Sequence, residues 1–426
     1  MDKEALVYVD LDGKPLLVGR LWGRVRRERE SATFEYDPSW LENPARFSLE
    51  PALQLGPGPF HTPGDLPMFG AIGDSAPDRW GRVLMRRMER RRAEREKTTP
   101  RTLREIDYLL LVDDEARQGA MRFADREGGP FLRDEDAKRI PPIMGLPKLL
   151  SASERFIEEK DTDEDLRLLI APGSSLGGAR PKASVRDKDG QLTIAKFPRK
   201  DDEIPTVVWE RVAFALAEKA GIVVPSVRLE EVAKKPVLLL RRFDREGARR
   251  IPFLSAMSML GAKDQEPRSY LEMVDALRQH GASPKEDIEA LWRRLVFNIL
   301  ISNTDDHLRN HGFLYQGQAG WRLSPAYDLN PMPIDLKPRV LSTMITEDDS
   351  TASLHLAMEV AGYFDLNVSK AKTIAAEVAQ SVSSWRKEAT RQGLSKTEID
   401  RMASAFEHDD LKFALGKSSG KPASGK

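Results

Sequence analysis

The stretch SNTDDHLRNHGF, residues 302–313, constrains this chain more than any other part of its sequence. It follows directly on a helix predicted over 283–301, whose apolar spacing and opening Ser-Pro-Lys-Glu indicate a buried helix with a capping box. Plain turn residues end a helix more simply than two aspartates, two histidines and two asparagines do. This concentration of polar side chains therefore indicates a site that performs chemistry.

The spacing of the acidic and amide side chains fits phosphoryl transfer. Asp305 precedes Asn310 by five positions, the interval between the catalytic aspartate and the metal-binding asparagine of protein kinases. The following GFLY and WRLS predict a hairpin that returns the chain to the same side, so Asp328 should lie near both residues. Asn310 and Asp328 then offer oxygen ligands for Mg²⁺, and Asp305 offers a base for an acceptor hydroxyl.

A lysine earlier in the chain needs an anionic partner. Strand alternation places Lys196 on one face with Leu192 and Ile194, where an ammonium costs free energy unless an anion meets it. Two candidates are Glu210, on the next predicted helix, and the phosphates of a nucleotide. The alternative is that Lys196 only extends to solvent from the strand end.

A glycine-rich stretch, APGSSLGGARPKAS, leads into the hairpin that carries Lys196. Gly173, Gly177 and Gly178 allow backbone N–H groups to approach a phosphate, although the stretch matches neither the Walker nor the dinucleotide pattern. Its position places it over whatever Lys196 contacts. A strand lysine, a helix glutamate, Asp-x4-Asn and a later metal aspartate thus occur in the order found in kinases.

The two histidines allow another interpretation. His307 and His311 are four residues apart beside aspartates and could hold zinc in a hydrolase that uses Asp305, Asp306 and His307. That spacing binds metal best on one helix face, whereas the flanking residues indicate a loop. We expect His307 to order this loop by hydrogen bonding.

At these residues the sequence resembles the HipA family, the serine/threonine-kinase toxins of bacterial type II toxin–antitoxin systems. The resemblance extends over nearly the whole chain and includes a Pro-Asp-x-Trp-Gly-Arg helix start. The matching stretches are PDRWGR, SLGGARPKAS, IAKFP, WERVAFALAEKAGIVVPSV, RRFDR, NTDDHLRNHGF and LSPAYDLNP.

The resemblance implies an α+β, bilobed, protein-kinase-like fold with an extra β-rich N-terminal subdomain and a mainly helical C-terminal lobe. It implies ATP and Mg²⁺ as cofactors, and autophosphorylation at Ser175, with Ser174 as the less favoured serine. Glu210 would form a structural ion pair. The implied catalytic residues are Asp305, Lys196 and Asn310; the metal ligands are Asn310 and Asp328; the ATP contacts are Gly177, Gly178, Ala179, Lys182, Lys196, Phe243, Asp244 and His307.

Three positions depart from common family residues. Arg241 stands where a hinge glutamate is frequent, which leaves adenine contacts to the backbone beside Phe243. Arg180 replaces a glutamine and Arg309 a lysine, so positive charge is kept at the latter. The chemistry requires none of the replaced residues.

The resemblance also implies partners. Characterised relatives phosphorylate aminoacyl-tRNA synthetases, so a translation factor is the expected substrate class. A HipB-like helix-turn-helix antitoxin is the expected partner, with DNA contacted mainly through it. The alternative function is therefore a regulatory partner of that antitoxin in a DNA-bound repressor complex.

Composition sets the limits of these hypotheses. Lys+Arg and Asp+Glu both number 67, so no overall charge directs the chain to nucleic acid. The absence of cysteine and of a long apolar run predicts a cytoplasmic protein without membrane contact.

Turn and cap signals predict the local organisation. We expect hairpins about Asp12-Gly13 and Asp189-Gly190, and a helix that begins at Ser75 as N-cap. The expected domains are an N-terminal subdomain, a linker with one short helix, a nucleotide lobe, a helical lobe and a disordered tail. Their ranges are 1–125, 126–165, 166–248, 249–416 and 417–426.

Overall fold

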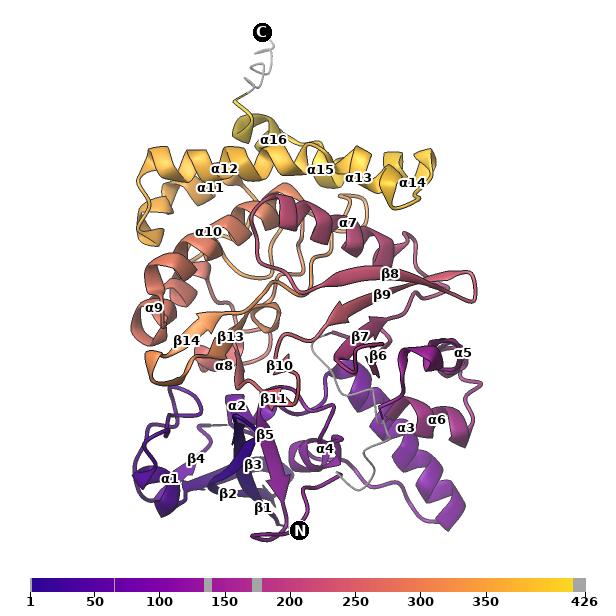
Figure 1. Ribbon diagram of the computed structural model, residues 1–426, viewed down its shortest axis with the longest axis vertical. Helices are drawn as coiled ribbons and strands as arrows, with labels where there is room; N and C mark the ends of the chain where they lie inside the picture. The colour runs from indigo at the N-terminus through magenta and orange to yellow at the C-terminus, as the bar shows by residue number, and fades with distance from the viewer. Residues whose placement is uncertain (1, 65, 134–139, 171–177, 417–426) are drawn as a thin grey trace. The chain divides into compact units, whose positions relative to one another are not determined.

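The computed structural model describes residues 2–64, 66–133, 140–170 and 178–416 (Figure 1). The predictions for Gly173, Ser174, Ser175, Gly177 and the tail over 417–426 lie outside these residues. The chain forms two compact units. The first comprises 1–202, 228–264 and 312–318, and the second comprises 203–227, 265–311 and 319–426. The N-terminal part and the predicted nucleotide lobe, which we expected as separate domains, therefore belong to one unit.

A five-stranded sheet begins the first unit and is drawn in indigo and purple in Figure 1. The turn between its first two strands has positive φ at Asp12 and Gly13, which confirms the predicted hairpin. The strand order is β4-β3-β2-β1-β5, with β1 (Lys3–Leu11), β2 (Lys14–Arg26), β3 (Arg29–Tyr36), β4 (Pro59–His61) and β5 (Met121–Ala124).

The helix predicted to begin at Ser75 begins instead at Asp78. Ser75 belongs to the end of α2, where its hydroxyl donates to the carbonyl of Ile72 over 2.7 Å. Asp78 is the N-cap of α3 and accepts from the backbone N–H of Gly81 over 2.8 Å. Two helices share the stretch that we interpreted as one. The helices are α1 (Pro38–Glu42), α2 (Gly70–Asp74), α3 (Arg79–Glu96) and α4 (Glu105–Leu111).

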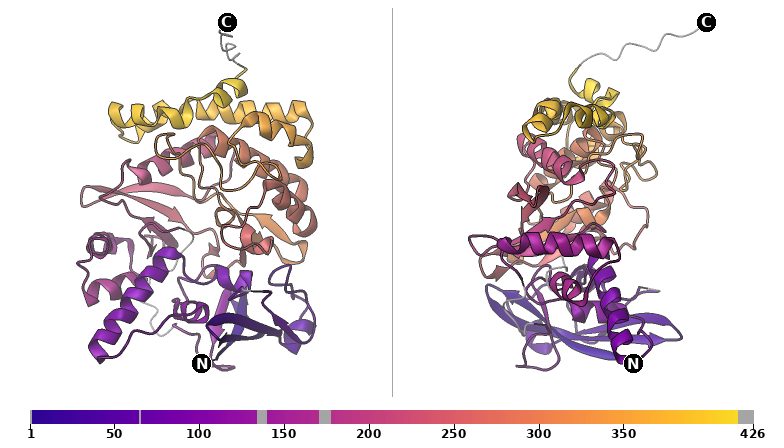
Figure 2. Two further views of the ribbon diagram at one scale, coloured as in Figure 1. Left: turned by 180° about the vertical axis from the view of Figure 1, so that it is seen from behind. Right: turned by 90° about the vertical axis from the view of Figure 1, so that its right-hand side faces the viewer.

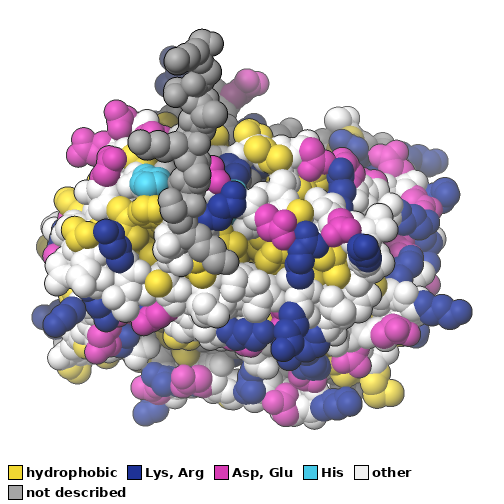
Figure 3. Space-filling view, turned by 90° about the horizontal axis from the view of Figure 1, so that it is seen from above, with side chains coloured by type: hydrophobic (Ala, Val, Ile, Leu, Met, Phe, Trp, Pro, Cys, Tyr) yellow, Lys and Arg dark blue, Asp and Glu magenta, His cyan; other side chains and the backbone are white. Residues whose placement is uncertain are grey.

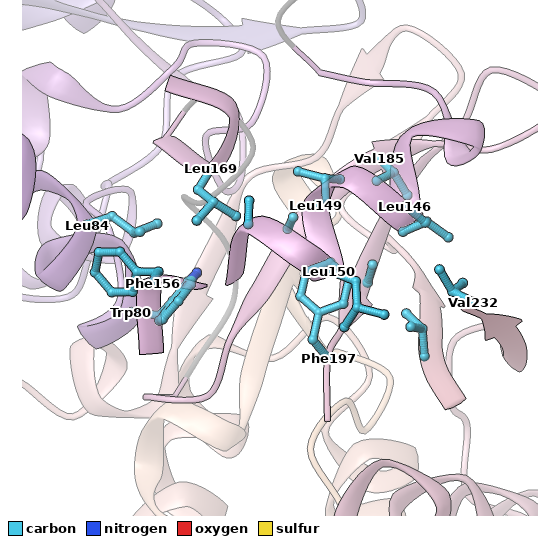
Figure 4. Close-up of a cluster of buried hydrophobic side chains, with 14 of the residues drawn as sticks. Trp80, Leu84, Leu146, Leu149, Leu150, Phe156, Leu169, Val185, Phe197 and Val232 are labelled. Atoms are coloured by element: carbon cyan, nitrogen blue, oxygen red, sulfur yellow. The ribbon is translucent and has the colours of Figure 1, made fainter. Parts of the chain in front are cut away.

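The segment predicted as a linker is instead packed into the core of the first unit. It contains η1 (Ile143–Gly145), α5 (Leu146–Ile157) and α6 (Asp163–Ile170), rather than one short helix. Their apolar side chains pack with those of α3 and of a four-stranded sheet (Figure 4). The cluster includes Trp80, Leu84, Leu146, Leu149, Leu150, Phe156, Leu169, Val185, Phe197 and Val232.

The four-stranded sheet carries the second predicted hairpin. Its strands follow the order β6-β7-β9-β8, and Gly190 has a φ of +78° in the turn between β6 and β7. The first unit also contains a short antiparallel pair of strands, β12 and β13. The remaining elements are β6 (Lys182–Arg186), β7 (Leu192–Lys196), β8 (Val227–Val232), β9 (Lys235–Arg241), β10 (Arg245–Glu246), β11 (Arg249–Arg250), β12 (Phe253–Ser255), α8 (Ala256–Met259) and β13 (Gly312–Tyr315).

The second unit is mainly helical. Its α7 is buried on nearly all sides, and Trp209 packs near Trp385 and Phe406, whose rings stack at 4.6 Å. Figure 2 shows the C-terminal helices from two further sides, and Figure 3 shows basic and acidic side chains interspersed over them. The elements are α7 (Thr206–Lys219), α9 (Tyr270–His280), α10 (Pro284–Leu300), η2 (Leu308–Asn310), β14 (Trp321–Leu323), α11 (Leu354–Glu359), η4 (Ala361–Phe364), α12 (Val368–Val382), α13 (Trp385–Arg391), α14 (Lys396–Arg401), α15 (Ala403–Phe406) and α16 (Asp409–Ala414).

Across the described residues, no helix combines the length and the apolar character needed to cross a bilayer.

Candidate active site

The polar stretch after α10 is held by the way the helix ends. Ser302 adopts a left-handed φ of +52°. Its N–H donates to the carbonyl of Ile299, and the next N–H, that of Asn303, donates to the carbonyl of Asn298 over 2.9 Å. This pair of bonds is the Schellman arrangement, which usually employs glycine. The buried Ser302 hydroxyl donates to the carbonyl of Ala405 over 2.9 Å, which compensates for the missing glycine.

The predicted catalytic base lies at the surface of the second unit. Asp305 exposes 55% of its side chain, and one carboxylate oxygen lies 3.6 Å from the ammonium of Lys337. The amide nitrogen of Asn310 donates to the backbone carbonyl of Asp305 over 2.7 Å, so the two ends of the Asp-x4-Asn motif are joined directly. A solvent-accessible carboxylate on a braced loop can accept a proton from an incoming hydroxyl.

The adjacent aspartate has a different environment. Asp306 is 1% exposed, and its carboxylate accepts hydrogen bonds from the Tyr270 hydroxyl and from the N–H of Ser342. Burial raises the pKa of Asp306 to about 7, although these hydrogen bonds oppose the rise. Asn298 donates to the Tyr270 hydroxyl over 3.0 Å, which connects this buried carboxyl to α10. Asp306 thus anchors the loop.

The two predicted metal ligands line the same small cavity in the second unit. Asn303, Asp306, Asn310, His311 and Asp328 supply polar groups to its wall. The side-chain oxygen of Asn310 is buried and has no hydrogen-bond partner among the described residues. An aspartate together with an unsatisfied amide oxygen fits a hard cation such as Mg²⁺, which takes few protein ligands. The predicted convergence of Asn310 and Asp328 is confirmed.

The Asp328 segment is tied to the catalytic loop at two further points. The amide of Asn330 donates to Asp328 over 2.7 Å, and the backbone N–H of Asn330 donates to Asn303 over 3.3 Å. The Tyr327 hydroxyl donates to the carbonyl of Arg309. These bonds hold the two segments in one geometry although about twenty residues separate them.

The two histidines of the loop differ in burial. His311 is 3% exposed, its ring meets that of Tyr270 edge-on at 5.4 Å, and burial lowers its pKa to about 3. It is therefore neutral near neutral pH. His307 is the N-cap of η2 without a side-chain cap bond, and its buried Nδ1 has no hydrogen-bond partner among the described residues, so the expected ordering of the loop by this atom is not observed. Among the described residues, no three His, Cys, Asp or Glu side chains come together to hold a metal ion.

The predicted nucleotide residues of the first unit form two buried charged groups. In the first, Lys182 and Lys196 lie directly opposite each other on β6 and β7, and they are 2% and 9% exposed. The ammonium of Lys182 donates to Asp78 over 2.8 Å and to the carbonyl of Gly178 over 3.1 Å. Asp78 was predicted only as part of a helix start. The inward strand position of Lys182 is the signal that could have indicated a partner, because a buried ammonium needs an anion nearby.

The second charged group holds the predicted hinge. Asp244 is 0% exposed, and its carboxylate accepts from Arg242 at 2.8 Å, from Arg245 at 2.9 Å and from the N–H of Gly119 at 2.8 Å. Arg242 also donates to the carbonyl of Arg117 over 3.0 Å. The Asp244 side chain is thus used inside the protein, which does not favour it as a direct ATP contact; a contact of adenine with the backbone beside Phe243 stays a prediction.

The other predicted residues near the hinge and on α7 differ in exposure. Arg241 exposes 49% of its side chain and lies 3.6 Å from Asp189, and the ring of Phe243 lies 6.3 Å from that of Phe253. Ala179 is exposed, and Arg180 pairs with Asp202. Glu210 is 3% exposed on α7, and its ion pair with Lys196 stays a prediction.

The fold places the chain in a known class. It resembles the structure of a chain from the complex of the toxin HipA, HipB and operator DNA of Shewanella oneidensis MR-1. The TM-score is 0.67, at 16% identity, over 96% of each chain. The chain therefore has the fold of that HipA chain.

Two family models then identify the family. The model of the HipA N-terminal domain matches residues 16–106, and that of the HipA-like C-terminal domain matches 174–386. The chain belongs to the HipA family.

Two curated relatives are similar in sequence. One is named "Putative kinase Y4mE", from Sinorhizobium fredii (strain NBRC 101917 / NGR234), and is 24% identical over 73% of this chain and 75% of its own length. A protein of Haemophilus influenzae (strain ATCC 51907 / DSM 11121 / KW20 / Rd), whose name carries the same description, is 22% identical over 49% of this chain and 66% of its own length.

Proposed function

We propose that the chain is an ATP-dependent serine/threonine protein kinase, the toxin of a type II toxin–antitoxin pair. The observation that supports this most is the unsatisfied oxygen of Asn310 in the cavity that Asp328 also lines, on a loop braced against the exposed Asp305. Kinase-like fold and family membership agree with this arrangement.

The proposed reaction transfers the terminal phosphoryl group of ATP to a hydroxyl. The acceptor oxygen forms a bond to phosphorus, the bond from phosphorus to the β-phosphate oxygen breaks, and ADP leaves. Asp305 accepts the hydroxyl proton. Asn310 and Asp328 would hold Mg²⁺, which supplies charge neutralisation for the phosphates. The chain's main contribution is the positioning of these groups.

The first unit would bind the nucleotide. Lys196 would contact phosphates, and the backbone beside Phe243 would contact adenine, since the Asp244 carboxylate is occupied by arginines. Ser175 is the proposed autophosphorylation site, with Ser174 as its competitor. A phosphate there would bring almost two negative charges into a loop that receives the phosphates of ATP, so we expect it to inhibit.

The proposed substrate class is a translation factor such as an aminoacyl-tRNA synthetase. The test is incubation of the purified protein with Mg²⁺, radiolabelled ATP and a panel of purified synthetases, beside the Asp305→Asn variant. Label on one synthetase that requires Asp305 would support the proposal. Label that persists at near-normal rate in folded Asp305→Asn would refute the catalytic assignment.

A second function, compatible with the first, is regulatory. The solved relative with the same fold occurs in a complex with HipB and operator DNA, which supports a helix-turn-helix antitoxin as partner here. The test is a promoter reporter carrying the partner with either wild-type protein or Asp305→Asn. Repression that survives loss of catalysis would support a separate regulatory role, and repression by the partner alone at full strength would refute it.

A further inference from the structure

A buried ion pair in the first unit connects residues that are far apart in sequence. Asp78 and Lys182 are 104 positions apart, and their side chains are 7% and 2% exposed. One carboxylate oxygen of Asp78 caps α3 through the N–H of Gly81, and the other meets the Lys182 ammonium at 2.8 Å. Burial raises the pKa of the Asp78 carboxyl, and the Lys182 ammonium opposes this rise. The same carboxylate therefore fixes both a helix and a strand.

The position of Lys182 makes this pair relevant to the nucleotide. Directly opposed residues of an antiparallel pair project from the same face of the sheet, so Lys182 and Lys196 face the same side. Two like charges in this arrangement repel each other unless an anion neutralises one of them. Asp78 neutralises Lys182, so the repulsion between the two opposed ammonium groups is reduced.

Lys182 also holds the end of the glycine-rich stretch. Its ammonium donates to the carbonyl of Gly178 over 3.1 Å. Gly178 has a φ of +85°, and a Cβ there would lie 3.5 Å from the Lys182 nitrogen, so the backbone passes close to the ammonium. Loss of the ion pair would therefore release the point at which this stretch enters β6.

The helix that carries Asp78 is fixed against the same strand. The indole N–H of Trp80 donates to the carbonyl of Lys182 over 3.0 Å. Trp80 and Leu84 are buried in the cluster with Phe156 and Val185 (Figure 4). The start of α3 therefore cannot shift without moving β6.

We propose that Asp78 is a positioning residue for the nucleotide: through Lys182 it fixes Gly178 and the charge balance opposite Lys196. The N-terminal part of the chain thereby sets the affinity for ATP. This inference rests on the proposed kinase function. It assigns to Asp78 a role through Lys182, without direct contact with ATP.

The test is the Asp78→Asn variant, because asparagine keeps the helix cap and removes only the charge. We expect the dissociation constant of Mg²⁺ with the non-hydrolysable analogue AMP-PNP, measured by calorimetry, to rise about tenfold or more, because a buried ammonium loses its anion. The turnover number at saturating ATP should stay within about threefold, since the reacting groups are untouched. Addition of Lys182→Met to Asp78→Asn should cause little further loss of affinity, because both substitutions break the same path from Asp78 through Lys182 to Gly178.

The matched control is Glu105→Gln. Glu105, at the start of α4, pairs at 2.7 Å with Arg82 of α3, the helix that Asp78 caps, and it takes no part in the contacts of β6 described above. The Glu105→Gln variant should lower the free energy of unfolding without changing the affinity for AMP-PNP.

A nucleotide-independent measurement separates this proposal from the kinase proposal. Hydrogen exchange of the backbone over 178–186 should accelerate in Asp78→Asn and stay at the wild-type rate in Glu105→Gln. Absence of nucleotide binding in the wild type would refute the kinase proposal on its own. Unchanged exchange, or unchanged affinity in a wild type that binds the analogue, would overturn the role of Asp78.

Discussion

The predicted hinge of the first unit and the predicted catalytic loop of the second both carry charged side chains, but the two regions use them differently. At the hinge, the Asp244 carboxylate is fully buried and meets two guanidinium groups and a backbone N–H. In the loop, Asp305 is more than half exposed, and the Asn310 oxygen has no partner among the described residues. Charged groups whose hydrogen-bond partners all lie within the protein maintain its structure. Groups with remaining hydrogen-bonding capacity can bind a ligand or take part in a reaction.

The difference predicts that substitutions in the two regions change different quantities. At the hinge they should lower the free energy of unfolding. Substitutions of Asp305, Asn310 or Asp328 should lower the rate and leave the unfolding transition in place, whereas a substitution of the buried Asp306 should also change stability. The following variants test this separation, from the largest expected effect to the smallest.

Asp244→Asn should destabilise the protein by about 3–5 kcal/mol, because it leaves buried arginines without their carboxylate. Urea unfolding followed by circular dichroism measures the change. The control is the neighbouring Arg241→Gln, whose exposed pair with Asp189 should contribute less than about 1 kcal/mol. Equal losses in both variants would contradict the assignment of Asp244 as a buried clamp.

Asp328→Asn should lower the rate of phosphoryl transfer by about a hundredfold or more, because one charged group that stabilises the transferring phosphates is lost. The unfolding midpoint should change little. A titration with Mg²⁺ should show a raised requirement for the metal. A normal metal requirement and a normal rate would remove Asp328 from the proposed metal site.

Asp306→Asn should change the pH dependence of stability. The folded protein raises the pKa of Asp306 to about 7, above the ordinary aspartate value, so the folded state holds a proton that the unfolded state releases. The unfolding free energy should therefore fall as pH rises from about 4 to about 7, and the variant should show a smaller fall. Urea unfolding across this pH range measures the free energy of unfolding of both proteins. An identical dependence of this free energy on pH in the variant would contradict a buried, protonated Asp306 carboxyl.

Lys337→Ala should have the smallest effect. Its ammonium lies 3.6 Å from Asp305, and both side chains are about half exposed, so the pair should contribute less than about 1 kcal/mol to stability. Thermal unfolding should show almost no shift. A large loss of stability would mean that the catalytic loop depends on this pair more than its exposure allows.

Local signals predicted much of this structure. The Asp12-Gly13 and Asp189-Gly190 turns formed hairpins. Asp12 and Gly13 both adopt positive φ in a two-residue loop, whereas the second hairpin has a longer connection over 187–191, in which Gly190 adopts positive φ. The hairpin predicted after residue 311 also returned the chain so that Asp328 lines the same cavity as Asn310. Both results follow from backbone geometry over short distances.

Long-range pairing was not predictable from the same patterns. The segment over 126–165 contains charges and prolines that indicated a linker, yet Leu146, Leu149 and Phe156 face the core. Asp78 was interpreted only as part of a helix start, since its partner Lys182 follows 104 residues later. Burial of a charge shows that a partner exists, but the fold decides which one.

The most direct test of the account is the intact mass of the protein before and after incubation with Mg²⁺ and ATP, for wild type, Asp305→Asn and Asp306→Asn. We predict a gain of one phosphate in the wild type that maps to the peptide with Ser174 and Ser175, and no gain in Asp305→Asn. Asp306→Asn should keep a reduced gain, because its carboxyl supports the loop without touching the reacting atoms. An equal gain in Asp305→Asn, or no gain in folded wild-type protein that starts unphosphorylated, would contradict the proposed kinase site.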